Sequence, residues 1–510
     1  MDATIFTDIF GYYTAILPML LILVGALVMP AVYMFTRKKM AVTIASLAFL
    51  IASAVVNIIM LHYIDSLGDY IYFGSEDAPY CGIFMYTSFA GLLILLFQVV
   101  SFFAILVSGV SSEVTKLHFG AYGALMLIAT AGMMFVVSST DLIGIFVGVE
   151  AVSISSYALV TLKRRDPRAA EAGVKYVIIG GLSTALTIYG ISMIYGALGT
   201  IDLAVIGAKT HDPDFTYSWA FIIGIVTMMA GYGFKIAAAP FHMWAPDVYE
   251  GAATPVSLFL ATGSKKMGLA VFFKIFLFMF VGVTAVKVEP VQYLFAIVAA
   301  VSMTVGNVVA IAQNNIKRML AYSSIAQAGY ILIAMAVMTP YALTGGLFHM
   351  FTHVFMKGGA FLIVGALICA GVGEKISDYN GLAKRNPLLA FAMMIFLFSL
   401  AGVPPLAGFT SKFVLFSGAI YNDGVMSQWI WLAFIAILNS AISLYYYVRV
   451  IKAMYIERPA KGADQKLAIG KVFGFAIAVC AIAVVVLGVY PDIILDPCAT
   501  AANDLLHWWM

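Results

Sequence analysis

Charged residues are scarce in this chain of 510 residues: they make up 10% of it, while 63% of the residues are hydrophobic. A soluble domain carries roughly 25% charged and about 45–50% apolar residues. A chain so poor in charge cannot surround itself with a solvated surface, and no stretch is long and polar enough to form a soluble domain. The composition therefore predicts a protein that faces lipid and other helices.

Cysteine is also rare. The four cysteines lie far apart and form no CxxC pair: Cys81, Cys369, Cys480 and Cys498. Such spacing predicts neither a disulfide framework nor an iron–sulfur or zinc centre. The N-terminus lacks the basic region and the small-residue cleavage site of a signal peptide, so the first apolar run is expected to remain as a helix.

Long apolar runs, by contrast, are abundant. A membrane-spanning helix needs about 20 mostly apolar residues, and fourteen such runs can be counted. They cover 12–35, 40–62, 82–108, 119–138, 141–161, 170–197, 217–245, 254–281, 291–312, 318–338, 341–371, 387–419, 427–453 and 468–490. The pattern predicts an all-α polytopic membrane protein.

The basic residues support this count, because they alternate between connections. If the N-terminus lies outside, the odd-numbered connections lie in the cytoplasm and hold most of the 28 lysines and arginines. These are Arg37, Lys38, Lys39, Lys116, Lys163, Arg164, Arg165, Arg168, Lys317, Arg318, Lys375, Lys384, Arg385 and the basic residues of segment 449–471. The outer connections hold mainly acids, among them Asp65, Asp69, Glu76 and Asp77. The positive-inside rule thus places both termini outside a cytoplasmic membrane.

Seven basic residues remain inside the apolar runs: Lys175, Lys235, Lys265, Lys266, Lys274, Lys357 and Lys412. A charge at the centre of a membrane helix costs at least about 2.5–3.5 kcal/mol and marks a functional site by default. Lys175 and Lys274 can instead snorkel or pair locally. Glu150 is the one acid deep inside a run, and Lys235 is its candidate partner. The pair is either a static bridge or a working one; because buried ion pairs add little stability, we favour the working role.

Two of the runs are interrupted by proline. Pro240 follows Lys235 by five residues, and Pro404-Pro405 precedes Lys412 by seven. A proline removes a backbone hydrogen bond, and such a break is tolerated in lipid only where protein or water satisfies the freed groups. Interrupted helices in corresponding positions of two halves point to a transport pathway. We therefore predict two inverted five-helix units, 117–282 and 283–453, flanked by N-terminal helices in 1–116 and by a final helix with a short tail in 454–510.

The run 341–371 adds a row of titratable groups. His349, His353 and Lys357 are spaced by four, so they share one face of a helix. Histidine titrates near neutral pH and can pass a proton between its two nitrogens, which favours a proton relay. Two histidines at this spacing can also bind zinc, although no third ligand is evident. A third alternative is that the histidines only pack in the bundle, with neighbouring carbonyls as hydrogen-bond partners.

Three motifs carry a family resemblance: PFHMWAPDVYEGAATPV at 240–256, ATGSK ending at Lys265, and GVPPLAGFTSKF at 402–413. With them the chain resembles the antiporter-like membrane subunits of respiratory complex I, and among these the subunit N type. Two host complexes fit the resemblance, the bacterial NADH:quinone enzyme and the archaeal F420H2 dehydrogenase. The overall sequence resembles the archaeal one more. The histidine face looks more like the sister antiporter subunits.

The resemblance implies a proton-translocating subunit with fourteen helices and two inverted units. By motif position, Glu150, Lys235, Lys265 and Lys412 match the family's buried relay residues. The resemblance implies no cofactor in this chain, with flavin and iron–sulfur clusters in partner subunits. The expected partners are an antiporter-like sister subunit, small helical subunits, lipids and protons, and no nucleic acid.

Three other functions are weaker on the residues alone. A stand-alone or Mrp-type cation/proton antiporter would need a cation site, and one deep carboxylate is a poor one. A structural spacer would not need so many costly charges, and a channel would be expected to show rings of like charge or a filter motif.

Overall fold

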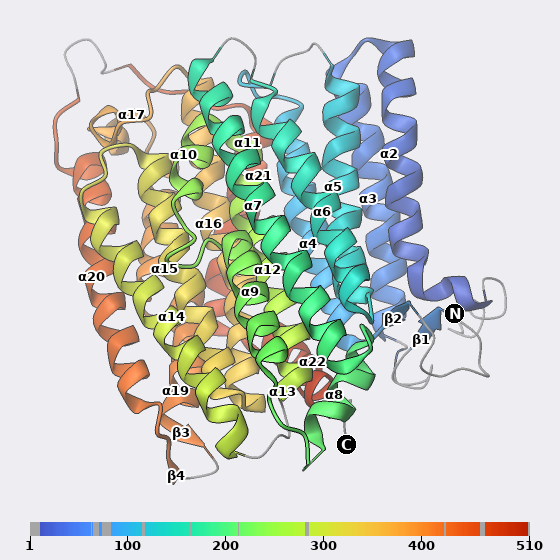
Figure 1. The fold of residues 1–510 in the computed structure, drawn as a ribbon. Coiled ribbons are helices and arrows are strands. Elements are labelled where there is room, and N and C mark those ends of the chain that lie inside the picture. Colours follow the sequence, from blue (N-terminus) through green and yellow to red (C-terminus); the bar gives the residue numbers. More distant parts are fainter. Residues whose placement is uncertain are drawn as a thin grey trace.

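The computed structural model describes residues 11–62, 64, 71–73, 83–114, 118–163, 166–212, 214–280, 285–422, 425–459 and 465–507. Within these ranges the chain forms a bundle of long helices that run side by side (Figure 1). Several residues used in the charge argument lie outside the described residues: Asp65, Asp69, Glu76, Asp77, Lys116, Arg164 and Arg165, as does Cys81.

Thirteen helices in the described part of the chain are long and apolar enough to cross a membrane. They are α2 (Leu17–Thr36, with a preceding turn η1, Gly11–Ile16), α3 (Lys39–His62), α4 (Ser88–Ser108), α5 (Phe119–Ser138), α6 (Leu142–Thr161), α7 (Pro167–Leu198), α9 (Trp219–Ile236), the continuous span Thr254–Phe280, α14 (Ala285–Ile311), α15 (Ile316–Val337), α16 (Pro340–Cys369), α20 (Ile430–Tyr455) and α21 (Lys471–Val489). The remaining expected span, 387–419, is present as two shorter helices, α18 (Pro387–Ala401) and α19 (Ala407–Ile420). The prediction of an all-α polytopic protein is confirmed.

Smaller elements that the apolar pattern did not reveal complete the fold. Among them are the helices α8 (Leu203–His211), α10 (Trp244–Gly251) and α17 (Leu382–Arg385), the turn η5 (Ile376–Tyr379), and two short antiparallel strand pairs, β1 (Ile71–Phe73) with β2 (Phe84–Tyr86) and β3 (Tyr421–Asn422) with β4 (Val425–Met426). The segment expected to be a short tail contains a helix, α22 (Asp492–His507), which packs against α4 and α16. Its buried residues include Cys498, Ala501 and Leu505, so contact with the bundle orders it.

Both predicted helix breaks are present, and each follows a residue with a left-handed backbone. Helix α9 ends at Ile236, Ala237 has φ 53°, and the chain runs through Pro240 before α10 begins. Helix α18 ends at Ala401, Gly402 has φ 90°, and α19 begins five residues later at Ala407. A positive φ redirects the chain after a helix, and the prolines prevent the helix from resuming at once.

The span Thr254–Phe280 lies in the interior of the bundle and is buried along its whole length. It consists of α11 (Thr254–Phe259), α12 (Lys265–Phe272) and α13 (Phe278–Phe280), joined by two wider π-type turns, η3 (Leu260–Ser264) and η4 (Phe273–Leu277). Helices α15 and α16 are almost as deeply buried. These three spans therefore provide the setting for any group that must be shielded from lipid.

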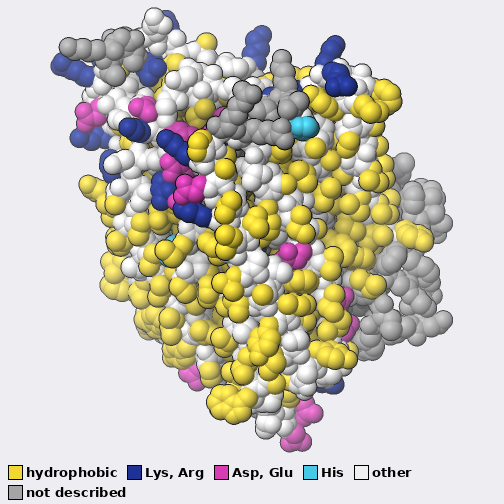
Figure 2. Space-filling model, turned by 45° about the horizontal axis from the view of Figure 1, so that its top comes forward, with side chains coloured by type: hydrophobic (Ala, Val, Ile, Leu, Met, Phe, Trp, Pro, Cys, Tyr) yellow, Lys and Arg dark blue, Asp and Glu magenta, His cyan; other side chains and the backbone are white. Residues whose placement is uncertain are grey.

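Charge gathers at one end of the bundle, opposite to the end where both termini lie (Figures 1 and 2). There Arg318 on α15 donates to Asp247 (2.7 Å) and Glu250 (2.9 Å) on α10. Burial alone would raise the pKa of the Asp247 carboxyl, but hydrogen bonds from Lys175 and Arg318 hold it below its ordinary value. These ion pairs fix the half-helix α10 against α15.

Candidate functional site

Lys235 lies one residue before the end of α9, at the first helix break, and only 2% of its surface is exposed. Its Nζ donates to the Oγ of Ser153 on α6, 2.9 Å away. The indole nitrogen of Trp244 donates to the carbonyl of Phe234 at 2.8 Å. Side chains thus satisfy backbone groups at the break, since Ser302 Oγ also accepts from the N–H of Ala239 at 2.9 Å, as expected for a break at membrane depth.

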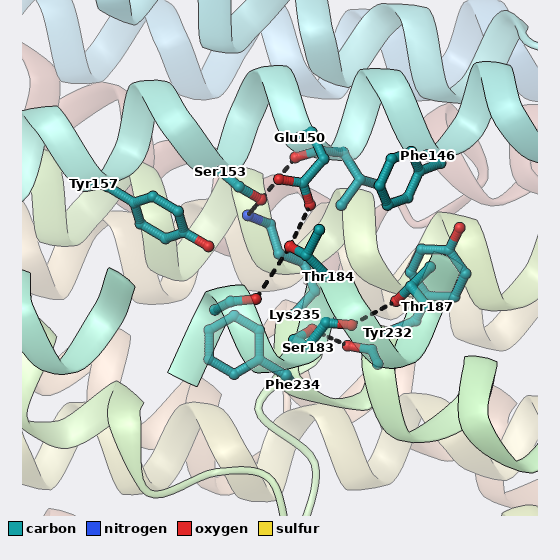
Figure 3. Close-up of a pocket in the computed structure, with 13 residues that line it drawn as sticks. Phe146, Glu150, Ser153, Tyr157, Ser183, Thr184, Thr187, Tyr232, Phe234 and Lys235 are labelled. Carbon is teal, nitrogen blue, oxygen red and sulfur yellow. Dashed lines mark hydrogen bonds between the residues drawn. The ribbon is translucent and has the colours of Figure 1, made fainter. Parts of the chain in front are cut away.

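Glu150 lines the same small pocket as Lys235, but the two are not in direct contact (Figure 3). Thr184 Oγ1 on α7 donates to Glu150 Oε1 at 2.8 Å, while Lys235 takes Ser153 as its partner. Both Glu150 and Ser153 belong to α6, so one helix presents the acid and the hydroxyl to the lysine. Glu150 and Lys235 therefore face the same polar pocket, as expected for neighbours, but they form no salt bridge within the described structure.

Lys265 follows directly after the π-type turn η3 and is 1% exposed. Its Nζ lies 5.8 Å from the ring centroid of Tyr249 on α10. Among the described residues it has no hydrogen-bond partner, and neither do the buried hydroxyls of Tyr249 and Tyr176. A buried ammonium without a protein partner is costly, which marks this region as one where polar partners must come from water or from another state of the site.

His349 is held at both ring nitrogens. Its Nδ1 lies 2.8 Å from Ser411 Oγ on α19, and its Nε2 lies 2.8 Å from Gln327 Oε1 on α15. His353 is one turn further along α16, with its ring centroid 6.3 Å from that of His349. Neither nitrogen of His353 has a hydrogen-bond partner in the described part of the chain. The two histidines therefore share a face, as predicted, but have different surroundings.

Lys357, another turn along α16, points to α15. Its Nζ donates to the carbonyl of Leu320 at 2.9 Å and to the hydroxyl of Ser323 at 2.7 Å. The side chain is fully buried. Lys357, His353 and His349 thus form a buried row along α16, between Lys265 on one side and α15 on the other.

Lys412 lies at the second helix break and caps it. Its Nζ donates to the carbonyls of Leu400 (2.8 Å) and Ala401 (3.3 Å) at the end of α18, and to Ser440 Oγ (3.0 Å) on α20. The same ammonium lies 4.7 Å from the ring centroid of Tyr330. A cation at a helix C-terminus satisfies free carbonyls and interacts favourably with the helix dipole. The break and the lysine therefore depend on each other.

A shared carbonyl connects the histidine row to the second break. Gln327, which contacts His349, also donates through Nε2 to the carbonyl of Leu400 at 3.1 Å. Lys412 donates to that same carbonyl. The sequence placed Lys412 and His349 in separate runs; the structure connects them by three hydrogen bonds, through the carbonyl of Leu400 and the side chain of Gln327.

Sequence reasoning missed several of these groups. Lys266 was counted among the buried basic residues but was not assigned to the path; it is as buried as Lys265, and its charge acts on both histidines. Ser153, Thr184 and Gln327 carry no motif, since serine, threonine and glutamine are common in helices. Lys175 pairs with Glu171 and Asp247 at the charged end, as expected for a locally paired lysine. Lys274 is buried and donates to the carbonyl of Val137, in the last turn of α5, at 2.6 Å.

A metal site at the histidines finds no further ligand. Among the described residues there is no group of three or more His, Cys, Asp or Glu side chains that could hold an ion. The neighbours of the two histidines are lysines, a glutamine and a serine, and cations nearby oppose binding of another cation. The arrangement is suited to holding and exchanging protons.

Comparisons with known proteins agree on one family. A family model described as "NADH:quinone oxidoreductase/Mrp antiporter, TM" matches residues 139–443. The chain is 43% identical to F420H2 dehydrogenase subunit N of Methanosarcina mazei, covering 76% of this chain and 78% of that protein. It is 40% identical to NADH-quinone oxidoreductase subunit N of Desulforamulus reducens, with coverage of 76% and 78%. Among solved structures, a chain of a membrane-bound sulfane sulfur reductase, an archaeal respiratory membrane complex, superposes with a TM-score of 0.86 at 26% identity, covering 97% of this chain and 98% of that one.

Proposed function

Because this chain belongs to the NADH:quinone oxidoreductase/Mrp antiporter family, we propose that its buried lysines, Glu150 and the histidines of α16 form the proton path of a redox-driven membrane complex. The chain is a membrane-arm subunit of the complex I type, and its relatives are the N subunits of NADH-quinone oxidoreductase and of F420H2 dehydrogenase. Its part in the reaction is proton translocation, and electrons move in partner subunits that hold flavin and iron–sulfur clusters.

One observation carries the assignment: buried titratable groups continue from the first helix break to the second. Lys235 lies at the first break and Lys412 at the second. Lys265 and the row on α16 occupy the interior between them. Each such group is expensive in a membrane, and intramembrane ionisable groups mark ion pathways and proton relays.

The first step is proposed to occur at the pocket between Glu150 and Lys235. When Lys235 is protonated, the carboxylate across the pocket attracts it. When Lys235 loses its proton to the interior, that attraction is lost, so the pair sets how readily the proton leaves. Ser153, in the same pocket, accepts from Lys235 and donates to the carbonyl of Val149, so it holds the ammonium in place beside the acid.

The middle of the path runs from Lys265 to His353 and His349. Lys265, Tyr249 and His353 have buried polar atoms without protein partners in the described structure. Such atoms are usually satisfied by internal water, and a chain of water molecules and imidazoles can pass protons. His349 then delivers the proton toward Lys412 through Gln327 and Ser411.

The two interrupted helices support the division into two inverted units, 117–282 and 283–453. For orientation, the charged end of the bundle lies opposite to both termini (Figures 1 and 2). The positive-inside rule favours placing that end in the cytoplasm. We therefore propose a cytoplasmic-membrane protein with both termini outside, in contact with an antiporter-like sister subunit and small helical subunits.

The test is proton pumping by the assembled complex in membrane vesicles, measured together with electron transfer. Lys235→Ala and Glu150→Gln are expected to leave assembly intact and to lose most of the protons moved per electron pair. Lys38→Ala, at an exposed lysine of the charged end, is the control. Normal pumping by an assembled Lys235→Ala complex would exclude this lysine from the path.

The same vesicles discriminate against the Mrp-type alternative. Sodium-dependent proton exchange in the absence of electron transfer would favour a cation antiporter. Co-purified subunits with flavin and iron–sulfur spectra would favour the redox pump, and the electron donor they accept would identify the host enzyme.

A further inference from the structure

A second polar network lies beside the α16 row and takes no part in the steps above. Its groups come from three helices, α14, α15 and α20, and each is at most 1% exposed. They are Ser323, Tyr330, Asn307, Tyr446 and Tyr447. Buried polar groups are costly unless they are fully hydrogen-bonded, so a connected set of five calls for a role.

One end of the network contacts Lys357. The Nζ of Lys357 donates to Ser323 Oγ at 2.7 Å, and the hydroxyl of Ser323 is hydrogen-bonded to that of Tyr447. The ring of Tyr447 packs against that of Tyr446, with centroids 4.4 Å apart. Hydrogen bonds thus link the lysine to Ser323 and Tyr447, and the neighbouring Tyr446 continues the row of hydroxyl groups toward α14.

The other end of the network contacts Lys412. Tyr446 donates to Asn307 Oδ1 at 2.9 Å, and Asn307 Nδ2 lies 3.1 Å from the hydroxyl of Tyr330. The ring of Tyr330 lies under the ammonium of Lys412, 4.7 Å from its centroid. A cation over an aromatic face is attracted by the ring quadrupole. The network therefore spans the distance between the two lysines.

The direction of these hydrogen bonds is fixed by the amide. Asn307 Nδ2 also faces the backbone carbonyl of Asn439 at 3.1 Å. A carbonyl only accepts, so the NH2 group of Asn307 must point there and its Oδ1 must face Tyr446. Because each hydroxyl has one proton to donate, Tyr446, which donates to Asn307, can only accept from any other partner.

The same reasoning continues to the lysine. Ser323 accepts from Lys357, and its own proton is then available for the hydroxyl of Tyr447. With its proton given to Tyr447, Ser323 presents its oxygen to Lys357. Hydrogen bonds aligned in this way strengthen one another and stabilise the ammonium form of the lysine.

This stabilisation opposes the other groups near Lys357. The charged groups that act on it are Lys265 and Lys266, both of the same sign, and His353 lies on its own helix. None of them is a carboxylate. Repulsion between like charges in the interior is strong, so the protonated lysine depends on its two acceptors, the carbonyl of Leu320 and the hydroxyl of Ser323 with Tyr447 behind it.

We propose that Tyr447, Tyr446 and Asn307 are positioning residues of the proton path, which hold Lys357 in a form able to carry a proton and couple it, through Tyr330, to Lys412. This inference rests on the proposed function, because it assigns the network a role only if these two lysines relay protons. It adds α14 and α20 to the helices that contribute side chains to the path.

The experiment measures redox-linked pumping against pH in vesicles that contain the assembled complex. Tyr447→Phe and Tyr446→Phe keep the rings and remove the hydroxyls. We expect the alkaline limb of the pumping profile to move to lower pH by roughly half a unit to one unit. The rate of electron transfer, measured with an uncoupler present, should not change. The sign follows because a less stabilised ammonium loses its proton at lower pH.

Tyr122→Phe is the matched control. This tyrosine is also buried, and its hydroxyl contacts Ser108 on α4, away from the path, so its loss should leave the profile in place. Unshifted profiles in both Tyr447→Phe and Tyr446→Phe, beside a Lys357→Ala variant that pumps poorly, would overturn the positioning role alone. Normal pumping by Lys357→Ala and Lys412→Ala would overturn the relay and this inference with it.

Discussion

At the scale of single residues, the buried lysines of this chain differ mainly in which groups accept hydrogen bonds from their ammonium. Lys412 has two helix-end carbonyls and a serine. Lys357 has a carbonyl and a hydroxyl, whereas Lys265 has no hydrogen-bond partner among the described residues. A group without a fixed partner can change its protonation state with less rearrangement. In the proposed path, Lys265 is therefore expected to exchange its proton most readily, and Lys412 to hold its proton most tightly.

The two histidines give a prediction at this scale. His349→Ala should destabilise the protein more than His353→Ala, although both side chains are fully buried and the truncation is the same. Removing His349 leaves Gln327 Oε1 without its partner and leaves Ser411 with only the carbonyl of Gly408, at about 1–3 kcal/mol for an unsatisfied buried group. Thermal unfolding of the two purified variants, each in the same detergent, measures the difference. Equal shifts in the melting temperature would contradict the hydrogen-bond account.

At the scale of elements, the helix breaks are held by close backbone contact as well as by side chains. Gly408, in the first turn of α19, lies against α18: a Cβ placed there would sit 1.7 Å from the carbonyl oxygen of Ser399. The two half-helices can approach this closely only because the position has no side chain. Their approach brings Lys412 to the free carbonyls of α18.

Gly408→Ala is accordingly expected to force α18 and α19 apart. Overpacking of this kind costs about 1–3 kcal/mol or more, and it also displaces Lys412, so both assembly and pumping should fall. Gly196→Ala on α7 is the control, because a Cβ there meets nothing within 4 Å. The yield of assembled complex and its melting temperature are the readouts. A Gly408→Ala complex as stable as the Gly196→Ala complex would show that the contact can relax.

At the scale of the whole molecule, charge and burial are arranged along different axes. Charged side chains gather at one end of the bundle, and hydrophobic side chains cover much of its flank (Figure 2). The titratable groups of the path instead lie across the bundle, from the break of α9 to the break of α19. A proton would thus travel sideways through the interior, shielded by α14 and α16, before it reaches either surface.

The proposed orientation can be tested by cysteine labelling. In a chain without its four native cysteines, Lys209→Cys on α8 and Lys384→Cys on α17 both introduce an exposed thiol. A membrane-impermeant reagent should modify position 209 from the outer side and position 384 only from the cytoplasmic side. Modification with the opposite sidedness would invert the topology and with it the direction of the path.

The amino-acid sequence by itself determined the spans, the two breaks and the identity of the deep charges. Apolar length, proline and charge are local properties, and membrane insertion responds to them locally. For this reason Glu150, Lys235, Lys265, His349, His353, Lys357 and Lys412 could all be selected without a structure. The resemblance of three motifs to a known family added a function to this selection.

Only the tertiary structure decided the partners. Lys235 contacts Ser153, 82 residues away, and His349 contacts Ser411, 62 residues away. The packing of helices far apart in the chain creates these contacts, and no local pattern encodes them. The same holds for α22: its apolar face was too short to count as a span, and its burial against α4 and α16 depends on surfaces that exist only in the folded bundle.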